Sequence, residues 1–101
     1  MTIETCINLV DAMEPNGYPE AVKRRILGEL EGRLRVELQG KAAAEDDGML
    51  SVPHPYDQIY RFYLLAMICY MNGDRDRYEN AAEMYNAAFL NYGKWLRRRE
   101  D

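Results

Sequence analysis

The side chains that most often perform catalysis or bind metals are scarce in this chain of 101 residues. His54 is the only histidine in the sequence, so no ligand set at the spacing of a zinc site is available. Cys6 and His54 could be imagined as a nucleophile and its base, but no motif surrounds them, and Cys6 falls on the apolar stripe of a predicted helix. The sequence therefore predicts no catalytic residue, no metal and no cofactor, and we expect no enzyme activity.

Two short patterns resemble ligand-binding loops but lack the essential residues. Asp74 and Asp76 flank an arginine, which is not the ligand spacing of a calcium loop. Gly28 and Gly32 lie inside a predicted helix, without the following lysine and hydroxyl residue of a phosphate-binding loop. We therefore expect no calcium site, no nucleotide site and no small-molecule substrate.

The chain is acidic, with 17 acidic and 13 basic residues and a formal net charge of −4. An acidic chain argues against general binding to a phosphate backbone, and we expect no sequence-specific contact with nucleic acid. The exception is a basic cluster near the end of the chain. It complements the dipole of a C-terminal helix, or alternatively contacts nucleic acid or an acidic partner. Its members are Lys94, Arg97, Arg98 and Arg99.

The cysteines and the apolar runs indicate the environment of the protein. Cys6 and Cys69 are too few for a disulfide framework and fall within apolar helical patterns, so we expect reduced core residues. The N-terminus has no basic region followed by an apolar run, so no signal peptide is predicted. The longest apolar run, residues 62–71, is about half of the roughly 20 residues that a bilayer requires. We expect no membrane contact.

Apolar residues recur at helical spacing in four stretches, which predicts one all-α domain over residues 1–101, a small bundle of about four helices. The short turn Asn72-Gly73-Asp74 makes the last two helices an antiparallel hairpin at the C-terminus. Residues 39–51 have no apolar period, and we expect an acidic mobile loop there, followed by an extended segment over residues 52–55. The predicted helices span residues 3–13, 19–38, 57–71 and 75–98.

The helix predicted over residues 19–38 has two unlike faces. Its leucine stripe predicts a buried face, and its i,i+4 charge pairs, Glu29 with Arg33 and Glu31 with Arg35, predict a solvated charge ladder. Away from the stripe lie two glycines, each costing about 1 kcal/mol relative to alanine. This small-residue strip indicates a packing face for another subunit, or alternatively a tolerated or slightly bent helix or packing within the monomer. The strip comprises Ala21, Gly28, Gly32 and Val36.

The predicted hairpin is rich in aromatic residues. The helix over residues 57–71 is apolar on every side, which predicts a central helix or one covered by neighbouring subunits. Six of the eight tyrosines fall in the two hairpin helices, where we expect their rings to fill the core and their hydroxyls to reach its edges. Tyr18 and Tyr56 remain outside that explanation.

Several short motifs, spread over most of the chain except the acidic loop, carry a resemblance to a known family. They are Leu9-Val10-Asp11 with Pro15-Asn16-Gly17-Tyr18, Pro53-His54-Pro55-Tyr56-Asp57 with Ile59-Tyr60, Asn72-Gly73-Asp74 with Asp76-Arg77-Tyr78 and Asn80, and Tyr85-Asn86-Ala87-Ala88-Phe89 with Trp95. With these motifs the sequence resembles small helical head–tail connector (head-completion) proteins of tailed phages and prophages of Gram-positive bacteria.

The resemblance implies a structural subunit that joins copies of itself in a ring between the portal and the tail of a virion. Its partners would be portal or tail components, and its location the cytoplasm of a bacterial host or the virion itself. The resemblance implies no catalytic residue. The residues alone are equally compatible with a small cytosolic helical adaptor or regulatory module, which could form a homodimer.

Overall fold

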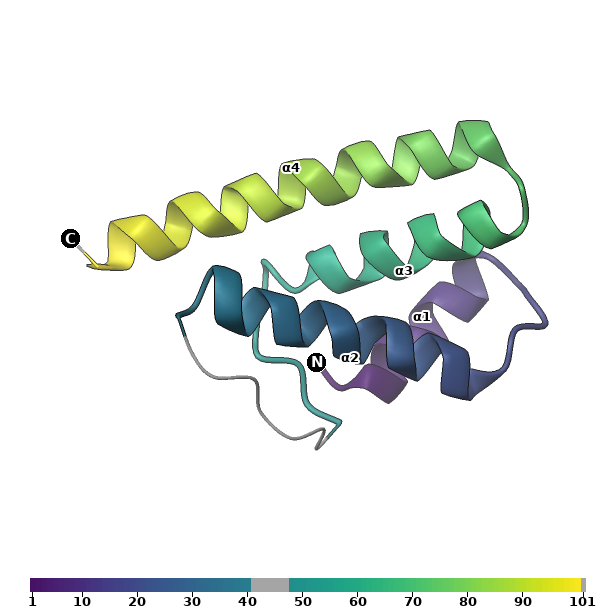
Figure 1. The fold of residues 1–101 in the computed structure, drawn as a ribbon, viewed down its shortest axis with the longest axis horizontal. Helices are drawn as coiled ribbons and strands as arrows, with labels where there is room; N and C mark the ends of the chain where they lie inside the picture. Colours follow the sequence, from purple (N-terminus) through teal and green to yellow (C-terminus); the bar gives the residue numbers. More distant parts are fainter. Residues whose placement is uncertain (41–47, 101) are drawn as a thin grey trace.

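The computed structural model describes residues 1–40 and 48–100 of the chain. Within these residues the chain forms four α-helices, and its only β-type pairing is an isolated bridge between Thr2 and Met49. The predicted all-α bundle is therefore confirmed. The helices are α1 (Ile3–Met13), α2 (Glu20–Glu37), α3 (Gln58–Met71) and α4 (Arg75–Glu100) (Figure 1).

The central element of the bundle is α3. Its backbone lies close to all three other helices, whereas the backbone of α4 lies close only to that of α3 among the described helices. Figure 1 shows α4 running antiparallel to α3, which confirms the predicted C-terminal hairpin, with α1 and α2 on the opposite side of α3. Leu64 and Ile68 are buried on one side of α3, and Ile59 and Ala66 are buried on the other. Coverage of α3 is incomplete, because its first residue is exposed, Tyr70 is 63% exposed at its C-terminal end, and several residues between them are half-buried.

The turn between α3 and α4 follows from its sequence. Gly73 has φ +74°, a left-handed conformation that glycine adopts without strain. The N–H of Asp74 reaches back to the carbonyl of Cys69 at 3.0 Å, which closes the end of α3. The Asp74 carboxylate then accepts a hydrogen bond from the Arg77 N–H at 3.3 Å and so caps α4.

Aromatic rings fill the contact between α3 and α4. The rings of Tyr63 and Tyr85 lie 5.1 Å apart between centroids, and Tyr92 is buried further along α4. Tyr56, which precedes α3, stacks on Trp95 at 5.0 Å and so extends the same seam. The predicted aromatic core is therefore present and includes Tyr56, but the prediction is wrong for Tyr70, whose side chain is largely exposed.

The N-terminus is fastened to the segment that precedes α3. The N–H of Ile3 donates to the carbonyl of Gly48 at 2.9 Å, and the N–H of Leu50 donates to the carbonyl of Met1 at 3.1 Å. The described ends of the predicted mobile loop are thus held by hydrogen bonds, while residues 41–47 lie outside the described residues. Residues 54–57 form a turn that contains a cis His54–Pro55 bond, so the prediction of an extended segment is wrong there.

Candidate interaction surfaces

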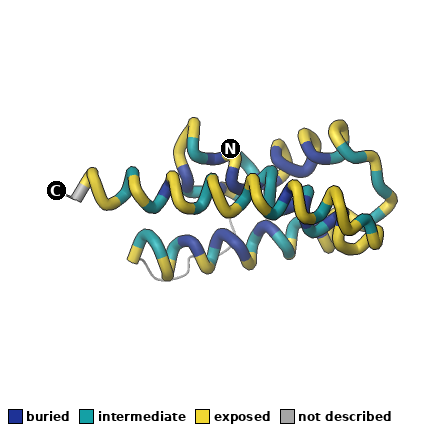
Figure 2. Tube along the Cα trace, turned by 90° about the horizontal axis from the view of Figure 1, so that it is seen from above, coloured by how far each residue is buried: buried dark blue, intermediate teal, exposed yellow. Residues whose placement is uncertain are grey.

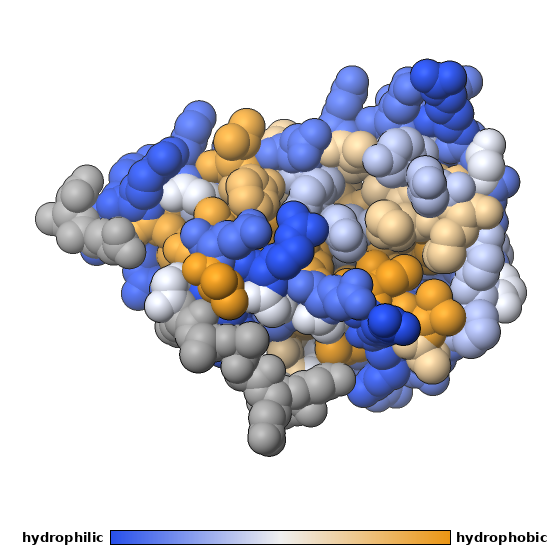
Figure 3. Space-filling view, in the orientation of Figure 1, coloured by the Kyte–Doolittle hydropathy of each residue, from blue (hydrophilic) through white to orange (hydrophobic). Residues whose placement is uncertain are grey.

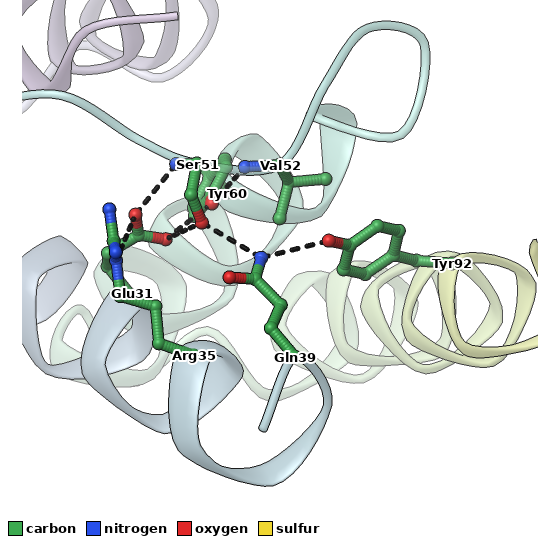
Figure 4. A network of polar contacts seen from close by, with 7 residues as sticks. All are labelled: Glu31, Arg35, Gln39, Ser51, Val52, Tyr60 and Tyr92. Carbon is green, nitrogen blue, oxygen red and sulfur yellow. Dashed lines mark hydrogen bonds and ion pairs between the residues drawn. The ribbon is translucent and has the colours of Figure 1, made fainter. Parts of the chain in front are cut away.

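A buried carboxylate lies at the junction of α2, α3 and the segment before α3 (Figure 4). Glu31 accepts hydrogen bonds from the Tyr60 hydroxyl at 2.6 Å and from the Ser51 N–H and Oγ at 2.7 and 3.1 Å. The Arg35 Nε also donates to the Glu31 carboxylate, to Oε2 at 3.3 Å. The prediction of a solvated charge ladder is wrong here, because Glu31 and Arg35 are drawn into a buried network. The predicted pairing of Glu29 with Arg33 is also wrong, because the exposed Glu29 pairs with Arg25 instead.

The Glu31 network joins three parts of the fold. The Tyr60 hydroxyl also accepts a hydrogen bond from the Val52 N–H at 3.0 Å, so it acts both as a donor and as an acceptor. Burial, together with the hydrogen bond to Glu31, raises the pKa of Tyr60, which keeps this hydroxyl protonated as a donor. Tyr60 is fully buried, and both carboxylate oxygens of Glu31 already accept hydrogen bonds from neighbours. We therefore interpret the network as a structural connection.

The same network continues to the C-terminal half of α4. The Gln39 Nε2 donates to the Ser51 Oγ and to the Tyr92 hydroxyl, both at 2.9 Å. In Figure 4 the Gln39 Oε1 points away from Tyr92, and it has no hydrogen-bond partner in the described part of the chain. A hollow of about 370 Å³ opens beside these side chains, with Arg99 also lining it. The guanidinium of Arg99 lies 4.8 Å from the ring centroid of Trp95.

A second buried charge stabilises the corner between α1 and α2. Lys23 is only 4% exposed, and its Nζ donates to both Asp11 oxygens at 2.9 and 3.0 Å and to the Asn16 Oδ1 at 3.2 Å. Burial alone would raise the pKa of Asp11, but hydrogen bonds from Lys23 and Asn16 and the charge of Lys23 outweigh it and lower that pKa. Tyr18, in the same corner, donates to the Asn72 Oδ1 at 2.6 Å.

Sequence reasoning missed both buried charges, although each of them left a signal. Lys23 stands four residues before Leu27, on the buried stripe of α2, where a lysine needs a partner. Glu31 carried the same signal, since it stands four residues after Leu27 on that stripe, but its i,i+4 partner made it resemble a surface residue. Its main partners, Ser51 and Tyr60, are 20 and 29 residues away in the sequence.

The imagined pair of Cys6 and His54 has no basis in the geometry. Cys6 is fully buried, and burial raises the pKa of its thiol to about 12, so that it stays protonated at neutral pH. The side chain of His54 is 85% exposed and lies 3.4 Å from the Asp57 carboxylate. Cys69 is buried and free like Cys6, as expected of reduced core cysteines.

In residues 1–40 and 48–100, no group of three or more histidine, cysteine and acidic side chains is arranged to hold a metal ion. No helix in the described chain is both long enough and apolar enough to cross a bilayer.

The small-residue strip of α2 is open on its outer side. A Cβ atom placed on Gly28 or on Gly32 would meet no described atom within 4 Å outside the helix's own backbone. Neither glycine has a positive φ, so the helix conformation does not require glycine at these positions. Ala21 and Val36 are exposed on the same strip. Within the described residues, close packing in the monomer is therefore not the reason for these glycines.

The basic cluster lies on the exposed C-terminal turns of α4. Lys94, Arg97, Arg98 and Arg99 are all exposed, and none of them forms an ion pair with a described residue. Figure 3 shows apolar side chains over the same half of α4, and others around the N-terminal half of α2. Strip and cluster lie on different helices, α2 and α4, and so offer two separate surfaces.

Comparison of the chain with protein-family models, with curated proteins and with solved structures finds no match.

Proposed function

We propose that the protein is a structural assembly subunit of a phage or prophage virion, a head–tail connector that acts by protein–protein contacts. The proposal starts from the sequence resemblance to connector proteins. Many residues that carry this resemblance, among them Asp11, Asn16 and Asp74, hold the corners of the fold together. The resemblance therefore concerns residues that determine the shape of a subunit, as is expected of a structural protein.

The observation that carries the proposal is the open strip of α2. Two glycines in a helix interior cost about 2 kcal/mol together relative to alanine, and no described contact within the monomer offsets this cost. A neighbouring subunit packed on Gly28 and Gly32 would offset it, because small residues permit close approach of two helices. The partners are copies of the chain in a ring, together with portal or tail components. The subunit needs no cofactor and no catalytic residue, and it is located in the host cytoplasm before assembly and in the virion afterwards.

Replacing both Gly28 and Gly32 with leucine should abolish self-association or binding to the portal ring. The leucine side chains would occupy the space that the neighbouring helix requires, while the isolated monomer has room for them. Native mass spectrometry and sedimentation with the portal protein of the same phage or prophage measure this loss.

The control is the double replacement of the same glycines with alanine. It should raise the free energy of unfolding by about 1 kcal/mol per site, because alanine is the better helix former. Full assembly of the double leucine variant, or a wild-type chain that stays monomeric at high concentration and ignores the portal ring, would refute the proposal.

The second candidate is a small helical adaptor or regulatory module that binds an acidic partner. It is favoured by the four cations at the end of α4, which have no described ion-pair partner. A deletion of residues 94–101 would be a poor test, because Trp95 packs on Tyr56 in the fold. Substitutions of the exposed Arg97 and Arg98 avoid this problem.

If the adaptor hypothesis is right, the double variant Arg97→Ser, Arg98→Ser should bind polyglutamate at least about tenfold more weakly than the wild type. Its helix content should not change, since both side chains are exposed. Fluorescence anisotropy at two salt concentrations measures the effect, because screening weakens contacts between exposed charges. Equal affinity of both chains for polyglutamate, or no binding by either, would remove this candidate.

A further inference from the structure

The outer face of α4 carries its charges in a segregated order. We define this face as the side of α4 that is turned away from α3, and Figure 2, seen from above, shows exposed residues along it. Acidic residues lie toward its N-terminal end, small or apolar residues at its middle, and basic residues toward its C-terminal end. All of its members are exposed: Asp76, Glu79, Asn80, Glu83, Ala87, Leu90, Lys94, Arg97 and Arg98.

The helix dipole explains only the two ends of this order. Its influence falls off within the first and last turns, which contain Asp76 and the arginines. Glu83 lies two turns further in from the start of α4, and Lys94 lies well before its end. The dipole also gives no reason for Leu90, which is 60% exposed at the middle of the face.

Within one chain, the arrangement is electrostatically unfavourable. Glu79 and Glu83 are four residues apart on the same face, as are Lys94 and Arg98, and like charges at this spacing repel each other. Glu79 has a single described partner, the exposed Arg75 at 3.2 Å. Glu83, Lys94 and Arg98 form no ion pair with a described residue. Within the described monomer, apart from Arg75 beside Glu79, these like charges therefore lack nearby opposite charges that would offset their repulsion.

A second copy of the same face supplies those charges in the right places. The midpoint between Glu83 and Lys94 along the helix coincides with the midpoint between Ala87 and Leu90. The midpoint between Glu79 and Arg97 lies within half a residue of it, about 0.8 Å of helix rise. An antiparallel partner helix centred at this point therefore brings acid opposite base at both ends.

We infer that two copies of the chain associate through this face, with their α4 helices antiparallel about a two-fold axis. Glu83 of each copy lies opposite Lys94 of the other, and Glu79 lies opposite Arg97. At the centre, Leu90 packs against Ala87, whose small side chain permits the usual 8–10 Å between helix axes. A two-fold contact is isologous, so each favourable pair occurs twice.

The partner of this surface of α4 is thus a second copy of the chain, and Lys94 and Arg97 of the basic cluster contribute to the contact. The strip of α2 stays free in such a dimer, since it lies on another helix. Because the contact involves one helix face, we expect a weak dimer that dissociates as the ionic strength rises.

A charge exchange between two chains tests the inference. The variant Glu83→Lys and the variant Lys94→Glu should each be monomeric, because each homodimer places two pairs of like charges face to face. An equimolar mixture of the two variants should associate again, because every pair in the mixed dimer is then of opposite charge. Sedimentation velocity at low and high salt measures association, and circular dichroism checks that each variant is folded.

The matched control is Glu29→Lys on α2, an exposed glutamate outside the face, which should leave association unchanged. We expect each α4 variant alone to dissociate at least about tenfold more readily than the wild type, and the mixture to approach it. A wild-type chain that is monomeric at every concentration, or a mixture no more associated than its components, would overturn the inference. Binding to a portal ring by such chains would still support the proposed function, so the two can fail separately.

Discussion

Replacing Glu31 with alanine should lower the free energy of unfolding by about 3–5 kcal/mol, the largest effect that we expect of any single change at a polar residue. The substitution leaves the Ser51 N–H and the fully buried Tyr60 hydroxyl without their acceptor. Small domains are stable by only about 5–15 kcal/mol, so a large fraction of the stability should be lost. Urea denaturation followed by circular dichroism measures the change.

A double-mutant cycle with Tyr60→Phe shows whether the loss arises from this contact. If Glu31 and Tyr60 act through their 2.6 Å hydrogen bond, the double variant should be clearly more stable than the sum of the two single losses predicts. The matched control is Glu29→Ala, because Glu29 forms an exposed ion pair on the same helix, and such pairs are worth about 0–1 kcal/mol. A loss below about 1 kcal/mol for Glu31→Ala would show that the network does not stabilise the fold.

Replacing Asp11 with alanine should cost about 2–3 kcal/mol at neutral pH, because it leaves the buried ammonium of Lys23 without a counter-charge. The cost is below that of a fully buried pair, since the carboxylate of Asp11 is partly exposed. The exposed Glu4, also on α1, is the control, and Glu4→Ala should change stability little. Urea denaturation again measures both variants.

The same pair should make stability depend on pH in the acid range. The pKa of Asp11 is lowered in the folded state, so its contribution is complete above the pKa of an unfolded aspartate, roughly 4. It is lost as the pH falls through the lower, folded-state pKa, where the carboxylate becomes protonated. The difference in unfolding free energy between wild type and Asp11→Ala should therefore shrink below about pH 4. A difference that stays constant from neutral to strongly acid pH would contradict this role of Asp11.

Local signals in the sequence were enough to predict the helices and their ends. The cap at Thr2, whose Oγ1 accepts the Thr5 N–H at 3.0 Å, and the turn at Gly73 depend only on neighbouring residues. The aromatic seam of α4 follows from helical spacing, since Tyr85 and Tyr92 stand seven residues apart. Such features require no knowledge of the rest of the chain.

The polar interior could not be predicted, because it depends on residues that are distant in the sequence. Glu31 is buried by Ser51 and Tyr60, and Tyr18 finds its partner at Asn72, 54 residues away. The small-residue strip of α2 was predicted from spacing alone. Whether the strip is open depends on the tertiary fold, because α1, α3 and the segment before α3 all pack on the opposite side of α2.

The short contact between the side chains of Gln39 and Ser51, 2.9 Å, has a consequence for how the length of this protein can vary. The chain leaves the bundle at the end of α2 and re-enters it at almost the same point, and the bundle fastens both points. The number of residues between positions 40 and 48 can therefore change without moving the points that the bundle fastens, because the pairing with the N-terminus begins at Gly48. Doubling the length of such a closed loop costs only about 0.6 kcal/mol in chain entropy. An insertion in the connection after α2 should therefore lower the stability of the fold only slightly.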